Sequence, residues 1–333
     1  MRSKSSIVLL LLLACTTTVP AASARGTSTN LTLVGYSTPR EAYAKLISGF
    51  QGTGDGGGVS FTQSYGASAD QSRAVAAGLK ADIVALSLAP DVDALVKAGL
   101  VDANWNKQSY KGLVTDSVVV IVLRDGNPKK IKSFDDLLRP GVQVITPNPF
   151  TSGGARWNVM AAYGAWLKEG ATPAHAQAKL LALFKNVAVQ DKSARDALNT
   201  FLSGKGDALL TYESEAIAAQ LQKQPVRYVI PKATIRIENP IAVLKSSPNR
   251  DKANQFIRYL KTPAAQQIFA DFGFRPIVPS VLEANRAKFP KRPDIFTIDN
   301  LGLGGWAKVQ QQFFDPKKGI MATIESKVGG ATG

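Results

Sequence analysis

Cysteine and histidine are almost absent from this sequence, with one of each among 333 residues. Because Cys15 has no second cysteine to pair with, the chain holds no disulfide of its own. The sequence also lacks a cluster of residues with the spacing of metal ligands. The lone histidine, His175 in TPAHAQAKLL, is interpreted as an exposed helix position. We therefore expect neither a metal nor a cofactor, and no cysteine nucleophile.

Acidic residues in a catalytic arrangement are also scarce. Glu213 and Glu215, in the stretch YESEA, could be imagined as the paired acids of a hydrolase. Acids placed in this way at the start of a helix more often stabilise that helix or form ion pairs. The sequence therefore does not favour an enzyme.

Long hydrophobic runs are missing apart from one short stretch near the N-terminus. Arg2 and Lys4 precede the run IVLLLLLAC. This run is too short to cross a bilayer, because a membrane-spanning helix needs about 20 apolar residues. A short apolar run behind basic residues is typical of a secretory signal.

Two processing sites are compatible with this signal. LLAC at 12–15 resembles a lipobox, in which Cys15 would become the lipidated first residue, whereas ASA at 22–24 suits ordinary signal peptidase. A lone thiol inside an export signal makes little sense as a core residue, so lipidation at Cys15 is favoured. We predict a signal peptide over 1–14 and a lipid-anchored tether over 15–30. The mature protein would then lie in the periplasm or on the outer face of the cytoplasmic membrane.

Acidic residues are fewer than basic ones, which gives a formal net charge of +15. Lysine and arginine are spread along the chain and do not cluster in one segment. No element interleaves basic residues with aromatic ones, as a nucleic-acid-binding segment would. The excess charge is therefore interpreted as a solvated basic surface, with no nucleic-acid partner.

What the sequence does contain is a regular alternation of short apolar runs and helical patterns. LTLVGY precedes PREAYAKLISGFQ, GVSFTQSY precedes ADQSRAVAAGL, and VQVITP precedes ARWNVMAAYGAWLKEG. Strands that alternate with helices in this way predict an α/β chain with largely parallel sheets. The glycine-rich stretch GTGDGGG at 52–58 precedes a strand and lacks a Gly-Lys-Ser/Thr ending, so it is a connector and not a nucleotide loop.

Several junctions between a strand and a helix share polar starting residues. SGG (152–154) opens one helix, while TPRE (38–41), SADQ (68–71) and SARD (193–196) resemble helix caps. Helix N-termini carry unpaired N–H groups that bind sulfate or phosphate, and glycines let the backbone approach an oxyanion closely. In α/β sheets these ends gather at the carboxyl edge of the strands. Ordinary helix capping explains the same residues, so the pattern alone leaves both interpretations open.

Longer motifs surround these junctions and continue to the end of the chain. Two of them overlap, namely GNPKKIKSFDDLLRPGVQVITPNP and ITPNPFTSGGARWN. The others are QSYGASADQSRAVAAGLKADIVAL, VDANW, GDALLTYESEA and FTIDNLGLGGWAKVQQQFF. In content and order, from about residue 31 to 320, this set resembles the sulfate-binding proteins of ABC importers. The resemblance implies a two-lobed α/β fold of the type II periplasmic-binding-protein class. Lobe 1 would comprise 31–115 plus 237–333 and lobe 2 would comprise 116–236, with two chain crossings as the hinge.

The same resemblance implies which residues bind the anion in the cleft between the lobes. They are Ser37, Ser68, Ser152, Gly153, Gly154, Ala194 and Tyr212. Main-chain N–H groups would be the principal donors, and Ser152 would add its hydroxyl. Ser37 stands where close relatives carry Asp, and Tyr212 stands where some members carry a Trp whose indole N–H reaches the ligand. These departures bear on ligand selectivity.

A site built only of donors suits sulfate, which is a dianion with no proton to donate, whereas hydrogen phosphate needs an acceptor. Asp70 and Asp196 are expected to face away from the anion, and Arg156 and Arg195 to brace the loops around it. The resemblance implies a monomeric sulfate receptor with an ABC permease and an ATPase as partners. The alternatives are thiosulfate, another oxyanion such as molybdate, tungstate or phosphate, and a secreted enzyme that acts on anionic esters.

Overall fold

The computed structural model describes residues 29–331 with the exception of residue 293. The predicted signal peptide, the lipidation site Cys15 and nearly all of the predicted tether lie outside the described residues. Within that described part, no helix combines the length and the apolar character needed to cross a bilayer.

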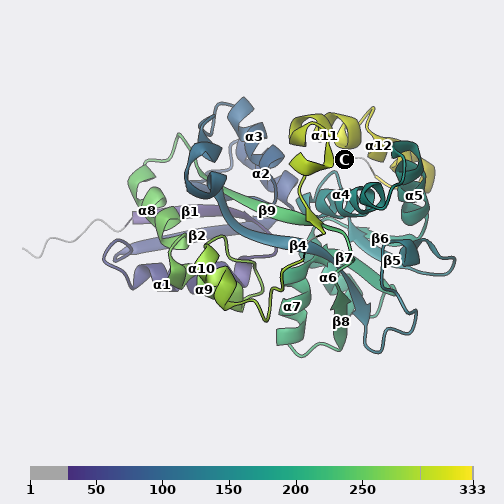
Figure 1. Cartoon of the computed structure of the whole chain (residues 1–333). Helices are drawn as coiled ribbons and strands as arrows, with labels where there is room; N and C mark the ends of the chain where they lie inside the picture. The colour runs from purple at the N-terminus through teal and green to yellow at the C-terminus, as the bar shows by residue number, and fades with distance from the viewer. Residues whose placement is uncertain (1–28, 293, 332–333) are drawn as a thin grey trace, which may run out of the picture.

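Three parallel strands form the sheet of the first lobe (Figure 1). Strand β1 (Thr29–Tyr36) lies between β2 (Val59–Gly66) and β3 (Ile83–Ala85), and both pairings are parallel. Because the strands run in one direction, their carboxyl ends meet at the same edge of the sheet. The chain passes from each of these ends toward a helix.

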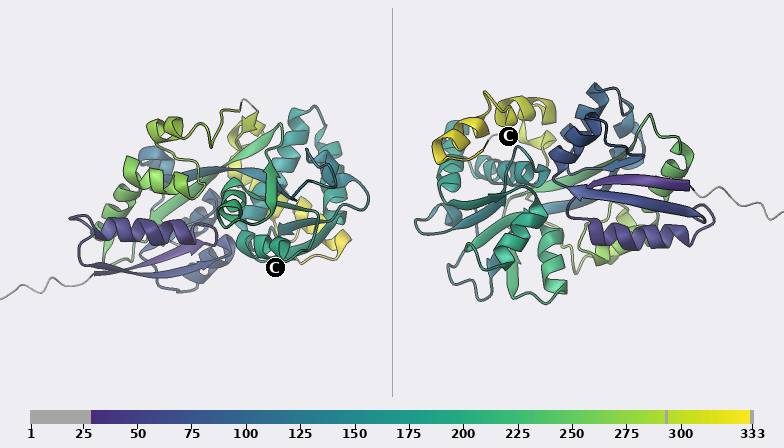
Figure 2. Two further views of the ribbon diagram at one scale, coloured as in Figure 1. Left: turned by 90° about the horizontal axis from the view of Figure 1, so that it is seen from below. Right: turned by 180° about the vertical axis from the view of Figure 1, so that it is seen from behind.

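The second lobe repeats this arrangement. Strand β5 (Val144–Pro147) lies between β6 (Val187–Asp191) and β7 (Ala208–Tyr212), again with parallel pairings. Strand β8 (Val226–Val229) completes this part of the sheet. Figures 1 and 2 show the two lobes side by side, with helices on both faces of the strands.

Two long strands, β4 (Leu113–Arg124) and β9 (Thr234–Val243), connect the lobes. They pair with each other in antiparallel fashion; β4 then continues along β7, and β9 continues along β3. The resulting strand order is β2-β1-β3-β9-β4-β7-β5-β6. The predicted parallel pairing therefore holds inside each lobe. Within this strand order the two connecting strands are antiparallel to their neighbours, because one leads the chain out and the other brings it back.

The helices bury one apolar face against these strands or against each other. In the first helix the buried residues Ala42, Tyr43, Leu46, Ile47 and Phe50 recur at helical spacing. The helices of the first lobe are α1 (Arg40–Gln51), α2 (Ser68–Ala76), α3 (Ala89–Lys97), α8 (Arg250–Leu260), α9 (Pro263–Asp271) and α10 (Pro279–Ala284). Those beside the second lobe are α4 (Gly153–Lys168), α5 (Pro173–Lys185), α6 (Ala194–Leu202), α7 (Glu213–Leu221), α11 (Gly305–Phe314) and α12 (Ile320–Val328).

Short elements complete the architecture. The two-residue strand β10 (Ile295–Phe296) pairs with β9 in parallel. The 3₁₀ helices are η1 (Trp105–Lys107), η2 (Ser109–Gly112), η3 (Asp135–Leu138) and η4 (Asp299–Leu301). The glycine-rich segment 52–58 is a turn that connects α1 to β2, as the sequence predicts.

The C-terminal helices differ from the expectation that residues 237–333 all return to lobe 1. Helix α12 packs against α5, and α11 packs against α12 and also against α3 of the first lobe. Trp306 lies 4.8 Å from Trp157 of α4, and Phe313 lies 4.7 Å from Tyr163 of the same helix, as measured between ring centroids. Helix α4 is buried along almost its whole length, so it needs a second layer over it, and the C-terminal helices supply that layer.

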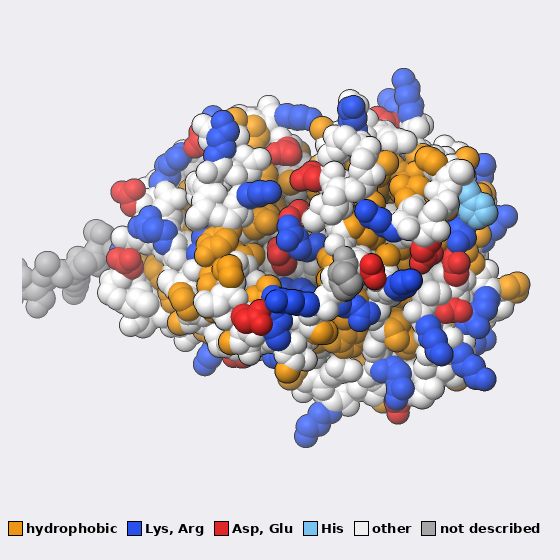
Figure 3. Space-filling view, in the orientation of Figure 1, with side chains coloured by type: hydrophobic (Ala, Val, Ile, Leu, Met, Phe, Trp, Pro, Cys, Tyr) orange, Lys and Arg blue, Asp and Glu red, His pale blue; other side chains and the backbone are white. Residues whose placement is uncertain are grey.

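Charged side chains are dispersed over the face of the molecule seen in Figure 3. Lysine and arginine side chains are scattered over the face shown in Figure 3, with acidic side chains between them. This distribution agrees with the interpretation of the excess charge as a solvated basic surface.

Candidate functional site

Three helices begin at residues that the sequence analysis singled out. Helix α2 begins at Ser68 after β2, helix α4 begins at Gly153 after β5, and helix α6 begins at Ala194 after β6. The first lobe contributes α2, while the second contributes α4 and α6. Each of these N-termini presents N–H groups and the positive end of a helix dipole.

Five main-chain N–H groups of the predicted site have no acceptor in the described part of the protein. Within residues 29–331, leaving aside 293, no hydrogen bond to a protein acceptor is made by the N–H groups of Ser37, Ser68, Gly153, Gly154 and Ala194. All of these residues except the half-buried Ser37 are buried. Buried N–H groups normally have a partner, so unpaired ones at converging helix ends indicate a place for an acceptor.

The capping predictions hold at two of the four helix starts. Ser193 accepts from the N–H of Asp196 at 3.2 Å, and Ser152 accepts from the N–H of Ala155 at 3.4 Å. At α1 the helix begins at Arg40, and Pro39 and not Thr38 holds the capping position. The predicted cap by Thr38 is therefore wrong.

The predicted cap by Ser68 is also wrong, because Ser68 is the first helical residue. Its hydroxyl donates to Asp91 Oδ2 at 2.6 Å and accepts from the N–H of Ser87 at 2.9 Å. A tertiary partner therefore takes the hydroxyl that could have capped the helix. Since the hydroxyl proton is already donated to Asp91, the main-chain N–H is the donor that Ser68 can offer to a ligand.

Close packing around Gly154 brings together the parts of the site in the second lobe. A Cβ atom on Gly154 would lie 2.8 Å from Cε2 of Tyr212 and 3.3 Å from Cβ of Ala194. Tyr212 is the last residue of β7, and its ring is 1% exposed. Gly154, Ala194 and Tyr212 are therefore direct neighbours.

The two lobes meet at Gly153. A Cβ atom there would lie 2.5 Å from Ser87 Oγ and 2.2 Å from Cδ2 of Leu88, both of the first lobe. The N–H of Ala69 in α2 also donates to the carbonyl of Thr151 at 3.1 Å. The glycine-rich start of α4 thus lies directly against the first lobe, next to the start of α2.

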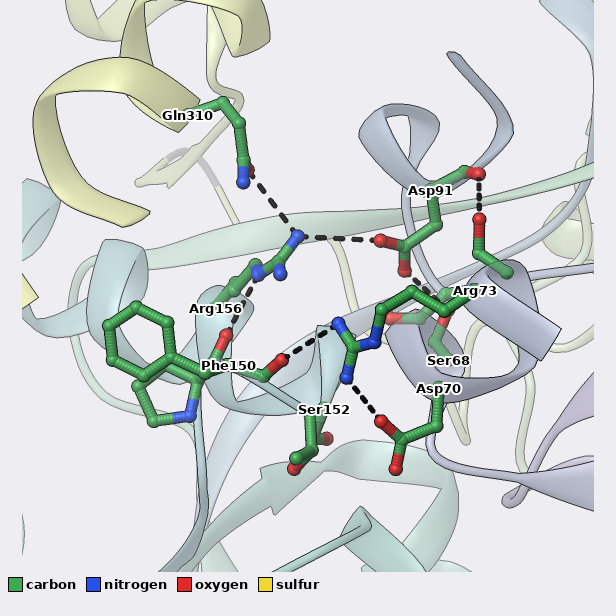
Figure 4. A network of polar contacts seen from close by, with 12 residues as sticks. Ser68, Asp70, Arg73, Asp91, Phe150, Ser152, Arg156 and Gln310 are labelled. Carbon is green, nitrogen blue, oxygen red and sulfur yellow. Dashed lines mark hydrogen bonds and ion pairs between the residues drawn. The ribbon is translucent and has the colours of Figure 1, made fainter. Parts of the chain in front are cut away.

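A buried ion pair holds these helix ends in place (Figure 4). Arg156 of α4 donates through Nε to the carbonyl of Pro149 at 2.8 Å, and its Nη1 lies 3.3 Å from Asp91 Oδ1. Gln310 of α11 lies 3.4 Å from the same guanidinium. Arg156 therefore braces the loop before α4, as expected, and reaches across to the first lobe.

A second arginine braces the start of α1 from the other lobe. Arg195 of α6 donates to the carbonyl of Thr38 at 3.0 Å, to Glu41 at 2.7 Å and to Glu215 at 2.8 Å. Beside it, Ser37 and Arg195 line a pocket of about 370 Å³ that also includes Arg40, Tyr65 and Ser193. Ser37 is therefore at the same junction between the lobes.

The carboxylates near these helix ends are already engaged. Asp70 pairs with Arg73, and Asp196 accepts from the Ser193 hydroxyl at 2.8 Å. Glu213 pairs with Arg275 at 2.6 Å, and Glu215 pairs with Arg195, so the imagined acid pair consists of two separate ion pairs. His175 is exposed on α5, as predicted.

The Tyr212 phenol is neutral in this setting. Burial raises the pKa of Tyr212 well above its ordinary value. The groups that surround the unpaired N–H donors are therefore a neutral phenol, neutral amides and charges that are already paired. Such a site can hold an anion with dipoles and hydroxyls. Among the described residues, no cluster of histidine, cysteine and acidic side chains has the arrangement of a metal site.

Sequence reasoning missed Ser87 and Asp91, which hold the donors in position. Ser87 stands two residues after the end of the buried strand β3, and Ser37 stands directly after β1. A polar residue at the carboxyl end of a buried parallel strand is a signal for a site residue. Applied to ADIVALSL, this signal could have found Ser87.

With this geometry in place, comparison with known proteins shows the family. Residues 31–275 match the family described as bacterial extracellular solute-binding protein, and the chain belongs to this family. It is 41% identical over 303 residues to a sulfate-binding protein of Synechococcus elongatus, covering 88% of this chain and 86% of that protein. A thiosulfate-binding protein of Pseudomonas aeruginosa is 34% identical, over 84% of this chain and 88% of its own length.

The fold is shared with solved structures of the same kind. The sulfate-binding protein SubI from Mycobacterium tuberculosis H37Rv has a TM-score of 0.83 and 43% identity, covering 86% of this chain and 100% of that chain. A periplasmic thiamin-binding protein at 17% identity has a TM-score of 0.69 over 93% of this chain and 99% of its own, which shows the fold alone. The chain is therefore a two-lobed solute-binding protein of a family that serves transport and acts outside the cytoplasm.

Proposed function

We propose that this protein is a sulfate receptor that captures the anion between its lobes and delivers it to an ABC permease and its ATPase. The observation that carries the proposal is the set of unpaired N–H groups at Ser37, Ser68, Gly153, Gly154 and Ala194. These donors come from both lobes and from several helix starts. The relatives named as sulfate-binding proteins support the same ligand.

The chemistry of the donors favours a fully deprotonated oxyanion. Every candidate donor is an N–H group or a hydroxyl, and the nearby carboxylates are bound to other partners. A dianion without a proton can accept from all of them. Burial of a doubly charged ion requires that each oxygen be satisfied, and several converging dipoles can do so. Thiosulfate, which a 34% identical relative is named for binding, fits the same chemistry.

The lobes account for capture and release. We propose that residues 31–115 form one lobe, that 116–236 form the other, and that the chain returns to the first lobe from 237. Strands β4 and β9 are the only strand connections between the described parts of the two lobes. An anion that bonds to both lobes binds the closed form more tightly than an open form, so it shifts the population toward closure.

Isothermal titration with a panel of anions tests this function. The purified protein is titrated with sulfate, thiosulfate, molybdate, tungstate and phosphate, and sulfate is expected to bind most tightly. Gly153→Asp places a carboxylate beside the donors and should abolish binding. Gly54→Asp, at an exposed turn with open space around it, is the matched control and should bind as the wild type does.

The opposite results would count against the receptor. Strong sulfate binding by Gly153→Asp would show that the anion lies elsewhere. If no oxyanion bound and the protein hydrolysed sulfate or phosphate esters, the alternative of a secreted enzyme would replace the receptor.

We further propose that the protein is a lipid-anchored monomer, held through Cys15 at the outer face of the cytoplasmic membrane. Cell fractionation of the full chain tests the anchor. Cys15→Ala should move the protein from the membrane fraction to the soluble fraction, whereas replacement of Ala24 by Asp, at the alternative cleavage site, should not. Continued membrane association of Cys15→Ala would contradict the lipobox interpretation.

A further inference from the structure

Ser87 is held in place through all of its backbone polar groups. It lies between β3 and α3 and is 0% exposed. Its N–H donates to Ser68 Oγ at 2.9 Å. Its carbonyl accepts from Trp157 Nε1 at 3.0 Å and from Asn239 Nδ2 at 3.0 Å. The backbone therefore fixes the Ser87 side chain at the contact between the lobes.

Among the residues that the structure describes, the Ser87 hydroxyl has one partner, the Tyr212 hydroxyl, at 2.6 Å. This bond joins the first lobe to the second, beside Gly153 and Gly154. Either hydroxyl could donate to the other. A tyrosine hydroxyl can both donate and accept, so by itself Tyr212 could serve a protonated or a deprotonated anion.

The position of the unpaired N–H groups favours one order. In either order one hydroxyl proton stays free for an acceptor outside the pair. A Cβ atom on Gly154 would lie 3.2 Å from the Tyr212 hydroxyl and 3.3 Å from Cβ of Ala194, so the phenol lies beside two of the unpaired N–H groups. An anion held there accepts from Tyr212 when Ser87 donates to Tyr212. The favoured order is therefore Ser87 to Tyr212 to anion, with each bond polarising the next.

We propose that Ser87 is a positioning residue that determines anion specificity, because it makes Tyr212 a donor. This inference rests on the proposed function and adds to it the basis of selectivity. Sulfate and selenate can accept from Tyr212. The hydroxyl of hydrogen phosphate would need an acceptor, and the Tyr212 oxygen that could serve is already occupied by the Ser87 proton. The neighbouring Ser68 hydroxyl is likewise committed, to Asp91.

Titration of sulfate, selenate and hydrogen phosphate at pH 8 tests this role, since the three are then mainly dianions. Ser87→Ala frees Tyr212 to accept. We expect sulfate and selenate to bind about 3- to 10-fold more weakly, the loss typical of one hydrogen bond. The affinity for hydrogen phosphate should fall less than this or should rise, so the ratio of sulfate affinity to phosphate affinity falls. Ser72→Ala is the control, because its buried hydroxyl donates to the Asp91 carbonyl and does not touch Tyr212.

A second variant tests whether Ser87 acts through Tyr212. In a Tyr212→Phe background, Ser87→Ala should cause no further change in the sulfate-to-phosphate ratio. An equal loss for all three anions in Ser87→Ala, or an unchanged ratio, would overturn the role of Ser87 while leaving the receptor intact. Absence of sulfate binding by the wild type would instead overturn the proposed function, and this inference with it.

Discussion

Single atoms explain why two glycines follow one another at the start of α4. Gly153 faces Ser87 and Leu88 of the opposite lobe, whereas Gly154 faces Tyr212 and Ala194 of its own lobe. Neither residue has a positive φ, so neither is required for backbone conformation. Both are required because a side chain would occupy space that another residue already fills. The sequence predicted close approach at these positions, and the structure shows protein atoms making that approach.

This difference between the two glycines gives a prediction. Gly154→Ala strains contacts within one lobe, so it should lower the free energy of unfolding without ligand by about 1–3 kcal/mol. Gly153→Ala strains only contacts across the lobes, so it should leave the free energy of unfolding without ligand nearly unchanged. It should weaken sulfate binding at least about tenfold, since a strain of about 1.4 kcal/mol in the closed form suffices for this factor. Urea unfolding and titration calorimetry measure the two effects, with Gly54→Ala as the control. Equal effects of both substitutions on unfolding would contradict this assignment.

At the scale of elements, local sequence patterns predicted where helices begin better than they predicted which hydrogen bonds the polar residues at those starts make. The apolar runs and helical periodicity located β1, α1, β2, α2, β5 and α4 close to their observed bounds. The role of Ser68 was mispredicted because distant residues compete for its hydroxyl, which Asp91 and Ser87 take. At α1 the helix begins one residue later than predicted, with Pro39 at the capping position, and the Thr38 hydroxyl has no hydrogen-bond partner among the described residues. Local sequence contains no signal for such long-range partners, whereas the Ser193 cap is local and was predicted.

The local cap of α6 can be tested directly. In Ser193→Ala the N–H of Asp196 loses its acceptor, so the free energy of unfolding should fall by about 1 kcal/mol. Sulfate affinity should also fall, because the cap sets the direction of the neighbouring Ala194 N–H. Ser203→Ala is the matched control: its hydroxyl donates to the carbonyl of Thr200 at the far end of the helix. A change in stability no larger than in this control would show that the cap contributes little.

At the scale of the whole molecule, the connection between the lobes contains a half-buried acid. Asp116 of β4 lies 3.8 Å from Arg236 of β9, and Arg236 also pairs with Glu238. The Oδ1 atom of Asp116 has no hydrogen-bond partner in the described part of the chain. Burial raises the pKa of Asp116 to about 7; Arg236 and Arg275 lower it, and Glu238 adds to the rise.

The raised pKa predicts how stability depends on pH. An aspartate in the unfolded chain titrates near pH 4, so protons bind the folded state more tightly. The stabilisation from this proton is fully present below about pH 4 and is lost as the pH rises through about 7. Asp116→Asn keeps the shape of the side chain without its charge. The free energy of unfolding of this variant should therefore exceed that of the wild type by an amount that grows between pH 4 and 8.5, to about 1–4 kcal/mol. Urea unfolding across this range measures it, with the exposed Asp55→Asn as control. A difference that stays constant with pH would show that Asp116 does not titrate in this window.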